Sequence, residues 1–187
     1  MKKYLYFLSI LFLGCLQDNP TIIFLTEVGE IEAEIYLNEA PITSKNFLFH
    51  INENHFNGAT FYRTVKTTNQ PYSKSKIEVI QGGLDSLENK FLPIPHERTN
   101  KTGIKHFDGT LSMARNEPGT ATTEFFICIG AQPELNFGGK RNPDGEGFAA
   151  FGKVIRGMEI VKKIQNQNDS LQRIQPPIKI LSIKIKN

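Results

Sequence analysis

The sequence of 187 residues contains no tryptophan and only two cysteines, and it has no long run of charges of one sign. Its aromatic side chains are instead 14 phenylalanines and 5 tyrosines. The 22 basic and 19 acidic residues leave a formal charge of only +3, which argues against a nucleic-acid partner. Hydrophobic residues make up 39% and charged residues 22%. These values exclude a wholly disordered chain and a polytopic membrane protein, and the length predicts one domain.

Motifs for metals and nucleotides are also missing. The four histidines form no His-x-x-x-His pair and there is no Cys-x-x-Cys, so we do not expect zinc. Gln81-Gly82-Gly83 lacks the context of a phosphate-binding loop, and no strand–GxGxxG–helix unit is present. We therefore expect neither a metal nor a cofactor. We interpret His50 and His55 as a half-exposed pair near the end of a helix, and His96 and His106 as hydrogen-bonding loop residues.

The first 14 residues are typical of a secretory signal peptide. A basic start precedes an apolar run that ends at Leu13, and its length of about ten residues is too short to span a bilayer. Segment 11–15, Leu-Phe-Leu-Gly-Cys, resembles the lipobox of bacterial lipoproteins, although Phe12 stands where that family usually has leucine. The resemblance implies removal of residues 1–14, lipidation of Cys15 and a tether over residues 15–20.

This reading places the protein in the bacterial cell envelope, lipid-anchored and either facing the periplasm or at the outer membrane. An ordinary cleaved signal and a buried N-terminal strand are the alternatives. With Cys15 lipidated, Cys128 has no intramolecular partner. Cys128 lies in the apolar run 125–129, so we interpret its thiol as a small buried hydrophobe rather than a nucleophile.

Residues 21–187 show the alternation of a mainly β domain. The pattern over residues 21–26 and 30–37 predicts a β-hairpin with one solvent-exposed face. Further strands are predicted over residues 61–65, 77–80, 110–114, 125–129, 148–154 and 178–185, with Pro176-Pro177 fixing the start of the last one. Between them, Thr67–Lys76 forms a mobile polar insertion and Pro133–Gly147 a second loop.

Two segments have helical spacing. Pro41 is followed by Thr43 and Ser44, which are N-cap residue types, and the apolar spacing after them predicts a helix that ends near Asn57-Gly58. The second predicted helix runs from Met158 to about Gln165. Seven or eight short strands with two helices indicate an antiparallel barrel or sandwich.

The candidate functional residues lie in five ordered blocks, and these blocks together resemble a known family. The blocks are Phe61-Tyr62-Arg63, Ile80-Gln81-Gly82-Gly83, Leu111-Ser112-Met113-Ala114-Arg115, Phe125-Phe126-Ile127-Cys128 and Phe151-Gly152-Lys153-Val154. In these blocks the chain, from about Ile22 to Ile185, resembles the cyclophilin family of peptidyl-prolyl cis/trans isomerases in its bacterial envelope branch. The resemblance implies a closed eight-stranded antiparallel β-barrel capped by two α-helices. It also implies proline-containing polypeptides as substrates, a monomer and no cofactor.

Isomerisation of an X-Pro bond needs no nucleophile, because no bond is broken. The barrier of about 20 kcal/mol is the resonance energy of the amide, and in the twisted state the proline nitrogen carries a lone pair. A fixed donor aimed at that nitrogen stabilises the transition state more than the planar ground state. A guanidinium suits this task because it stays protonated and presents rigid donors.

The resemblance assigns this role to Arg63, with Gln81 orienting the arginine and contacting the substrate backbone. Ala114 and Asn116 match the positions along which the substrate backbone lies. Apolar pocket or rim surface is implied for Phe61, Val79, Phe126, Leu135 and Phe148. Without the resemblance, these apolar residues would be interpreted as core.

Three carboxylates depart from the family pattern at the implied pocket. Glu78 replaces a usual phenylalanine, so the Thr67–Lys76 insertion is expected to rebuild that wall. Glu124, in the substrate-binding set, replaces a usual glutamine and is expected to pair with Arg63 or Arg115. Glu134 stands at a position that is tryptophan in many relatives, which accounts for one missing tryptophan and predicts weak cyclosporin binding.

The carboxylates motivate an alternative function, a proline-peptide-binding chaperone or docking module with low turnover. A lipocalin-like barrel that holds a small ligand is a third hypothesis. It requires a cavity inside the barrel, where a cyclophilin has its own side chains.

Overall fold

The computed structural model describes residues 18–85 and 91–186 of the chain. The predicted signal peptide and Cys15 lie outside the described residues, as does the first part of the predicted tether. Within the described ranges, no helix has both the length and the apolar character needed to cross a bilayer.

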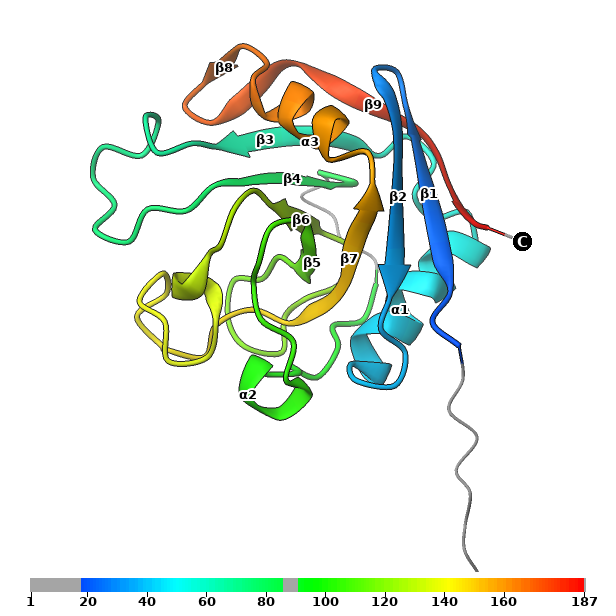
Figure 1. Cartoon of the computed structure of the whole chain (residues 1–187), viewed down its shortest axis with the longest axis horizontal. Helices are drawn as coiled ribbons and strands as arrows, with labels where there is room; N and C mark the ends of the chain where they lie inside the picture. Colours follow the sequence, from blue (N-terminus) through cyan, green and yellow to red (C-terminus); the bar gives the residue numbers. More distant parts are fainter. Residues whose placement is uncertain (1–17, 86–90, 187) are drawn as a thin grey trace, which may run out of the picture.

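The described part of the chain forms one sheet that closes on itself (Figure 1). The strand order is β1-β2-β7-β5-β6-β4-β3-β9, and β1 then pairs with β9, so eight strands form a closed antiparallel barrel. A ninth strand, β8, pairs only with β9 as a short hairpin. The strands are β1 (Thr21–Thr26), β2 (Gly29–Ile35), β3 (Thr60–Val65), β4 (Val79–Gly83), β5 (Thr110–Met113), β6 (Phe125–Cys128), β7 (Ala150–Arg156), β8 (Asp169–Ser170) and β9 (Arg173–Ile185).

The predicted fold is thereby confirmed, with strand bounds that shift by a few residues. The largest difference is at β9, which begins at Arg173 and runs through the two prolines that were expected to fix its start. Those prolines are exposed, and the strand pairs with β3 on either side of them, at Arg173 and at Ile178. Because the proline positions need no ladder hydrogen bond there, the strand continues.

Helices α1 (Pro41–Asn52) and α3 (Met158–Gln165) cover the barrel, at the lower right and at the top of Figure 1. A short helix α2 (Thr99–Thr102) and a 3₁₀ turn η1 (Pro133–Leu135) lie in the loops. The first helix ends at Asn52 and not near Asn57-Gly58 as predicted, and its predicted start also needs correction. The N-cap is Ala40, and the backbone N–H groups of Ile42 and Thr43 donate to the carboxylate of Glu97, at 3.2 and 2.7 Å. Glu97, from a distant loop, thus accepts the hydrogen bonds of the free N–H groups in the first turn. No residue near the start of the helix indicates this contact.

Aromatic side chains fill the interior of the barrel. Phe24, Phe47, Phe61, Phe125 and Phe151 are all fully buried in the main hydrophobic cluster. Phe47 from α1 contacts the rings of Phe24, Phe125 and Phe151 at centroid distances of 5.0 to 6.3 Å. This packing occupies the space that a lipocalin-like ligand would need.

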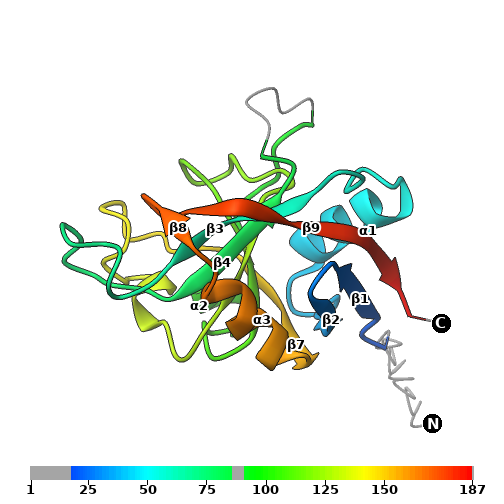
Figure 2. The same cartoon turned by 90° about the horizontal axis from the view of Figure 1, so that it is seen from above.

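Two segments that are far apart in sequence extend together from one side of the barrel. The loop between β3 and β4 and the hairpin β8–β9 both lie at the left in Figures 1 and 2. Lys66 forms an ion pair with Asp169 at 2.5 Å, and the side chain of Asn69 also donates to Asp169 at 3.0 Å. The predicted mobile insertion is therefore tied to the hairpin.

Candidate active site

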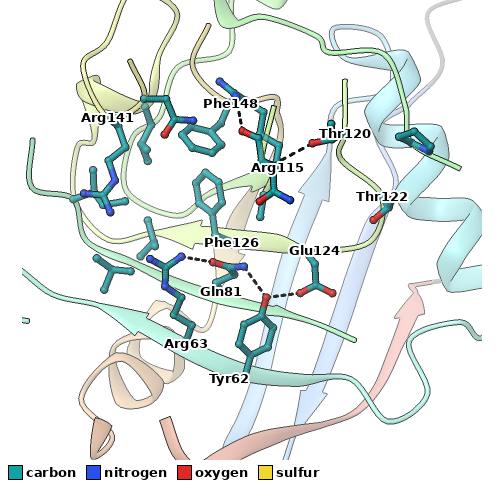
Figure 3. A pocket seen from close by; sticks show the side chains of 18 of the residues that line it. Tyr62, Arg63, Gln81, Arg115, Thr120, Thr122, Glu124, Phe126, Arg141 and Phe148 are labelled. Atoms are coloured by element: carbon teal, nitrogen blue, oxygen red, sulfur yellow. Dashed lines mark hydrogen bonds between the residues drawn. The ribbon is translucent and has the colours of Figure 1, made fainter. Parts of the chain in front are cut away.

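A cavity of about 700 Å³ opens on the outer face of the barrel, beside the tied loop. Figure 3 shows its residues converging from β3, β4, β6 and the loops after β5 and η1. In Figure 3 the rings of Phe126 and Phe148 lie between Arg63 and Gln81 on one side and Arg115 and Arg141 on the other. The lining includes nine residues of the predicted set, namely Arg63, Val79, Gln81, Ala114, Asn116, Glu124, Phe126, Leu135 and Phe148. Tyr62, Ile77, Arg115 and Arg141 also line it.

A β-bulge in β3 brings two consecutive side chains to the cavity. In the pairing with β4, Phe61 lies opposite Gly82 and Arg63 opposite Gln81, so Tyr62 is the extra residue. A regular strand would send Tyr62 and Arg63 to opposite faces, whereas a bulge re-aims them. Both line the cavity, while Phe61 points into the barrel core and is fully buried. The expectation that Phe61 supplies pocket surface is corrected accordingly.

The guanidinium of Arg63 is held by the carbonyl oxygens of two glutamines. Its Nη1 donates to Gln81 Oε1 at 2.9 Å, and its Nε and Nη2 both donate to Gln172 Oε1, at 3.0 and 2.7 Å. Gln172 lies in the turn between β8 and β9, where it has a positive φ of 70°. Its own amide N–H donates to the backbone oxygen of Asn69 at 3.1 Å, which turns its carbonyl toward the arginine.

A second chain of hydrogen bonds fixes the orientation of Gln81. The Gln81 amide donates to the Tyr62 hydroxyl at 2.6 Å, and that hydroxyl donates to Glu124 at 2.5 Å (Figure 3). The other Glu124 oxygen accepts from the backbone N–H groups of Leu84 and Asp85, at 2.8 and 3.2 Å. Because the Gln81 amide N–H group donates to Tyr62, the carbonyl of the same side chain is the group that faces Arg63.

The expected pairing of Glu124 with Arg63 or Arg115 is therefore wrong. Arg115 forms a two-pronged ion pair with Asp144, at 2.8 and 3.0 Å, and donates to the Gly147 carbonyl. The Glu124 carboxylate also fits closely over Gly83, where an added Cβ would come within 2.5 Å of it. Glycine at this position leaves the space that the carboxylate occupies.

Burial sets the protonation behaviour of this network. It lowers the pKa of Arg63, Tyr62 raises that pKa, and the cation Arg173 lowers it; a guanidinium nevertheless stays protonated in proteins. Burial raises the pKa of Glu124, against the hydrogen bonds from Tyr62 and the backbone, which lower it. Burial and the neighbouring Glu124 raise the pKa of Tyr62, so its hydroxyl keeps the proton that it donates.

The apolar part of the cavity is a second hydrophobic cluster on the outside of the barrel. Phe126 and Phe148 meet edge to face with centroids 5.4 Å apart, and Val79, Leu135 and Ile77 pack around them. Such an apolar surface can bury a proline ring. Ile77, which directly follows the insertion Thr67–Lys76, contributes to this wall, whereas no residue of the insertion itself lines the cavity.

His106 supports Phe126 from behind. Its ring stacks on Phe126 at 6.0 Å and 17°, and its two nitrogens bond Asn136 and Ser112, at 2.9 and 3.0 Å. His106 is only 1% exposed. It is thus a hydrogen-bonding residue, as expected, and it is buried under the candidate pocket.

Comparison with known proteins decides the family. The family model for cyclophilin type peptidyl-prolyl cis-trans isomerases matches residues 21–185. The chain belongs to the cyclophilin-type peptidyl-prolyl cis-trans isomerases. A peptidyl-prolyl cis-trans isomerase of Acinetobacter baylyi is 34% identical over 90% of this chain and 87% of its own length. Peptidyl-prolyl cis-trans isomerase B of Escherichia coli is 33% identical over 76% of this chain and 82% of its own length.

A solved cyclophilin has the same fold. The crystal structure of a Cryptosporidium parvum cyclophilin superposes with a TM-score of 0.73 at 23% identity and covers 90% of this chain and 98% of its own. The family, the barrel and the enzyme class predicted from the sequence are confirmed. The cyclophilin relatives are isomerases, and this chain is an isomerase of the same class.

Two carboxylates predicted at the pocket lie outside the cavity, and two residues of the observed site had no predicted role. Glu78 and Glu134 do not line the cavity; Glu78 accepts from Gln165 at 3.4 Å, and Glu134 accepts from the backbone N–H of Lys140 at 2.8 Å. Tyr62 stood in a quoted block but had no role assigned. Gln172 had no local signal, because its contact with Arg63 spans 109 residues.

We expect the free energy of unfolding of this cyclophilin to decrease as the pH is lowered, because of His106. Burial lowers its pKa to about 4, the hydrogen bond that it donates to Asn136 Oδ1 raises it, and the charge of Lys105 lowers it. The unfolded chain takes up a proton near pH 6.5, so stability is lost as pH falls from about 6.5 toward about 4, by up to about 3 kcal/mol. Urea unfolding should give a steeper loss for the wild type than for His106→Gln.

The comparison of the two proteins isolates His106 from other titrating groups. Burial also lowers the pKa of His50, and that contribution is present in both proteins. An equal pH dependence of the unfolding free energy in both proteins would contradict the assignment.

Proposed function

We propose that this cyclophilin accelerates X-Pro isomerisation by donating a hydrogen bond from Arg63 to the nitrogen of the twisted proline amide. The observation that carries the proposal is the fixed guanidinium beside the apolar cluster of Phe126 and Phe148. Three of its hydrogen bonds are used within the protein. A guanidinium has five N–H groups, so the bonds to described residues leave two for a ligand in the cavity.

The chemistry follows from what each part of the cavity can do. The apolar cluster holds the proline ring by burying its surface, while the peptide on the other side of the amide rotates. As the amide twists, its nitrogen gains a lone pair, and a donor already in place stabilises that state without reorganising. Two glutamine carbonyls and no carboxylate hold Arg63 among the described residues, so its positive charge is not neutralised.

Proline-containing polypeptides are the proposed substrates, and the protein is proposed to act as a monomer. The C. parvum cyclophilin has also been crystallised in the presence of the dipeptide Ala-Pro. The surfaces of Ala114 and Asn116 line the cavity next to Arg115, in a position to contact a peptide backbone. The chaperone alternative loses support, because Glu78 and Glu134 lie away from the cavity and Tyr62 engages Glu124.

Replacement of the proposed donor should abolish most of the activity. We expect Arg63→Ala to lower kcat/KM for a proline tetrapeptide by about 100-fold or more, because one preorganised transition-state donor contributes about that much. Arg63→Lys keeps the charge but loses the planar fork, so we expect an intermediate rate. NMR exchange between cis and trans peptide measures the rate without a coupling protease.

Arg156→Ala is the matched control, because Arg156 is a strand cation with a mostly exposed side chain that lies outside the cavity. Its rate should equal that of the wild type. Equal rates for Arg63→Ala and the wild type would overturn the proposed mechanism. Binding of the peptide without any rate enhancement by the wild type would favour the chaperone alternative.

Gln172 is proposed as a positioning residue, since it touches Arg63 and does not line the cavity. We expect Gln172→Leu to lower kcat by about tenfold with little change in KM, because small displacements of a catalytic group are costly. Gln172→Glu restores an acceptor and should recover part of kcat. A rise of KM with unchanged kcat would show that Gln172 acts on binding instead.

We further propose that the protein acts in the folding of envelope proteins, held by lipid at Cys15. The support is the lipobox-like segment 11–15 behind an apolar run. In the structure β1 starts beside the end of β9, at the pair Ile22 and Ile185, so a tether would leave from the barrel next to the C-terminal strand. Stable anchoring requires more than one acyl chain.

Lipidation can be measured on the full chain expressed in a bacterial host. We expect the wild type to incorporate an alkyne fatty acid and to enter the detergent phase on Triton partition, and Cys15→Ser to do neither. Cys128→Ser is the control, since Cys128 is fully buried and its thiol should not be acylated. A wild type that stays unlabelled would contradict the anchor.

A further inference from the structure

We propose that Arg141 forms a subsite for the carboxylate of an acidic residue near the substrate proline, so that this cyclophilin favours acidic sequences. The inference rests on the proposed function and concerns its substrate class. Arg141 lies in the loop after η1 and lines the same cavity as Arg63 and Phe126 (Figure 3). It therefore faces the space that the peptide would occupy.

Arg141 is held in place by the loop between β3 and β4. Its Nη1 donates to Gln70 Oε1, Ser73 Oγ and the Ser75 carbonyl, at 2.9, 2.8 and 2.9 Å. Gln70 is only 4% exposed, and its amide donates to the Ile77 carbonyl at 2.6 Å. The guanidinium is thus fixed before any ligand arrives, which lowers the entropy cost of binding.

All three acceptors of Arg141 are uncharged, and no ion pair between described residues includes it. Its side-chain bonds to the described residues use Nη1 alone, which leaves the N–H groups of Nε and Nη2 for a ligand. A carboxylate is a stronger acceptor for a guanidinium than an amide or a hydroxyl, and it can bind in a two-pronged manner.

The other charges of the cavity increase the attraction for an anion. Arg63 is held by glutamines, so it too lacks a counter-charge among the described residues. Arg115 is paired with Asp144, and Glu124 is bonded to Tyr62 and two backbone N–H groups, so neither can neutralise Arg141. Burial and the neighbouring Arg63 lower the pKa of Arg141, which is the sign of two cations that share one cavity.

The acceptors of Arg141 all belong to the insertion Thr67–Lys76, and Ile77, directly after it, packs in the pocket wall. An acidic preference would therefore be a property of this loop pair rather than of the barrel.

The test compares peptides that differ only in one charge. Tetrapeptides carry Glu or Gln directly before or directly after the proline, and NMR exchange gives kcat/KM for each. For the wild type we expect the Glu peptide to be favoured by about threefold to tenfold at one of the two positions, as for a partly exposed ion pair. The preference should shrink at high salt, because salt screens the attraction.

Variants separate the charge of Arg141 from its role in holding the loop. Arg141→Met should bring the Glu to Gln ratio to about one, and Arg141→Lys should retain part of it. Ser73→Ala removes one bond of the clamp but keeps the charge, so the ratio should persist. Lys140→Met removes an exposed neighbouring charge outside the cavity lining and should leave the ratio unchanged.

The outcomes distinguish this inference from the proposed function. Turnover of the Gln peptides together with a wild-type ratio near one at both positions would overturn the subsite and leave the isomerase mechanism intact. If no peptide were turned over, an NMR binding titration of the same Glu and Gln peptides would decide the subsite alone. Equal affinities in that titration would overturn it.

Discussion

A guanidinium that lines an apolar cavity needs hydrogen-bond acceptors, and a catalytic guanidinium needs acceptors that leave its charge available. In this protein two glutamine carbonyls meet both needs for Arg63, the proposed catalytic donor. A carboxylate in their place would hold the side chain more strongly but would also compete with the developing lone pair for the positive charge. The remainder of the site is arranged to keep the two amides turned the right way.

Each amide is oriented by a different part of the fold. Gln81 donates toward Tyr62 and Glu124, which are fixed by the bulge in β3 and by backbone N–H groups after β4. Gln172 donates toward Asn69, which is itself bonded to Asp169 of the hairpin. The pairing of β3 with β9 is what brings these two supports to one side chain. The fold thus contributes orientation, and the cavity contributes the apolar surface.

The local parts of this arrangement were accessible from the sequence, whereas the long-range parts were not. The alternation of polar and apolar residues, together with turn residues, predicted most strands. The two glycines of Gln81-Gly82-Gly83 are explained by packing, because Phe61 and Glu124 occupy the space where their side chains would lie. Phe61 was assigned to the pocket by the family resemblance, whereas the residue pattern alone predicted core, which is where its side chain lies. Glu97 at the start of α1 and Gln172 beside Arg63 act over 54 and 109 residues, so no local spacing could reveal them.

The loops show how one barrel can acquire a different substrate preference. Barrel strands are constrained by the packed phenylalanines inside, so a change there disturbs the whole core. The loop between β3 and β4 and the loop after η1 contact each other through Arg141 and are free of that constraint. A cation placed by such a pair can change what the cavity accepts while Arg63 and its two glutamines stay as they are. The proposed specificity and the proposed catalysis therefore depend on separate groups of contacts, and a substitution in one group need not disturb the other.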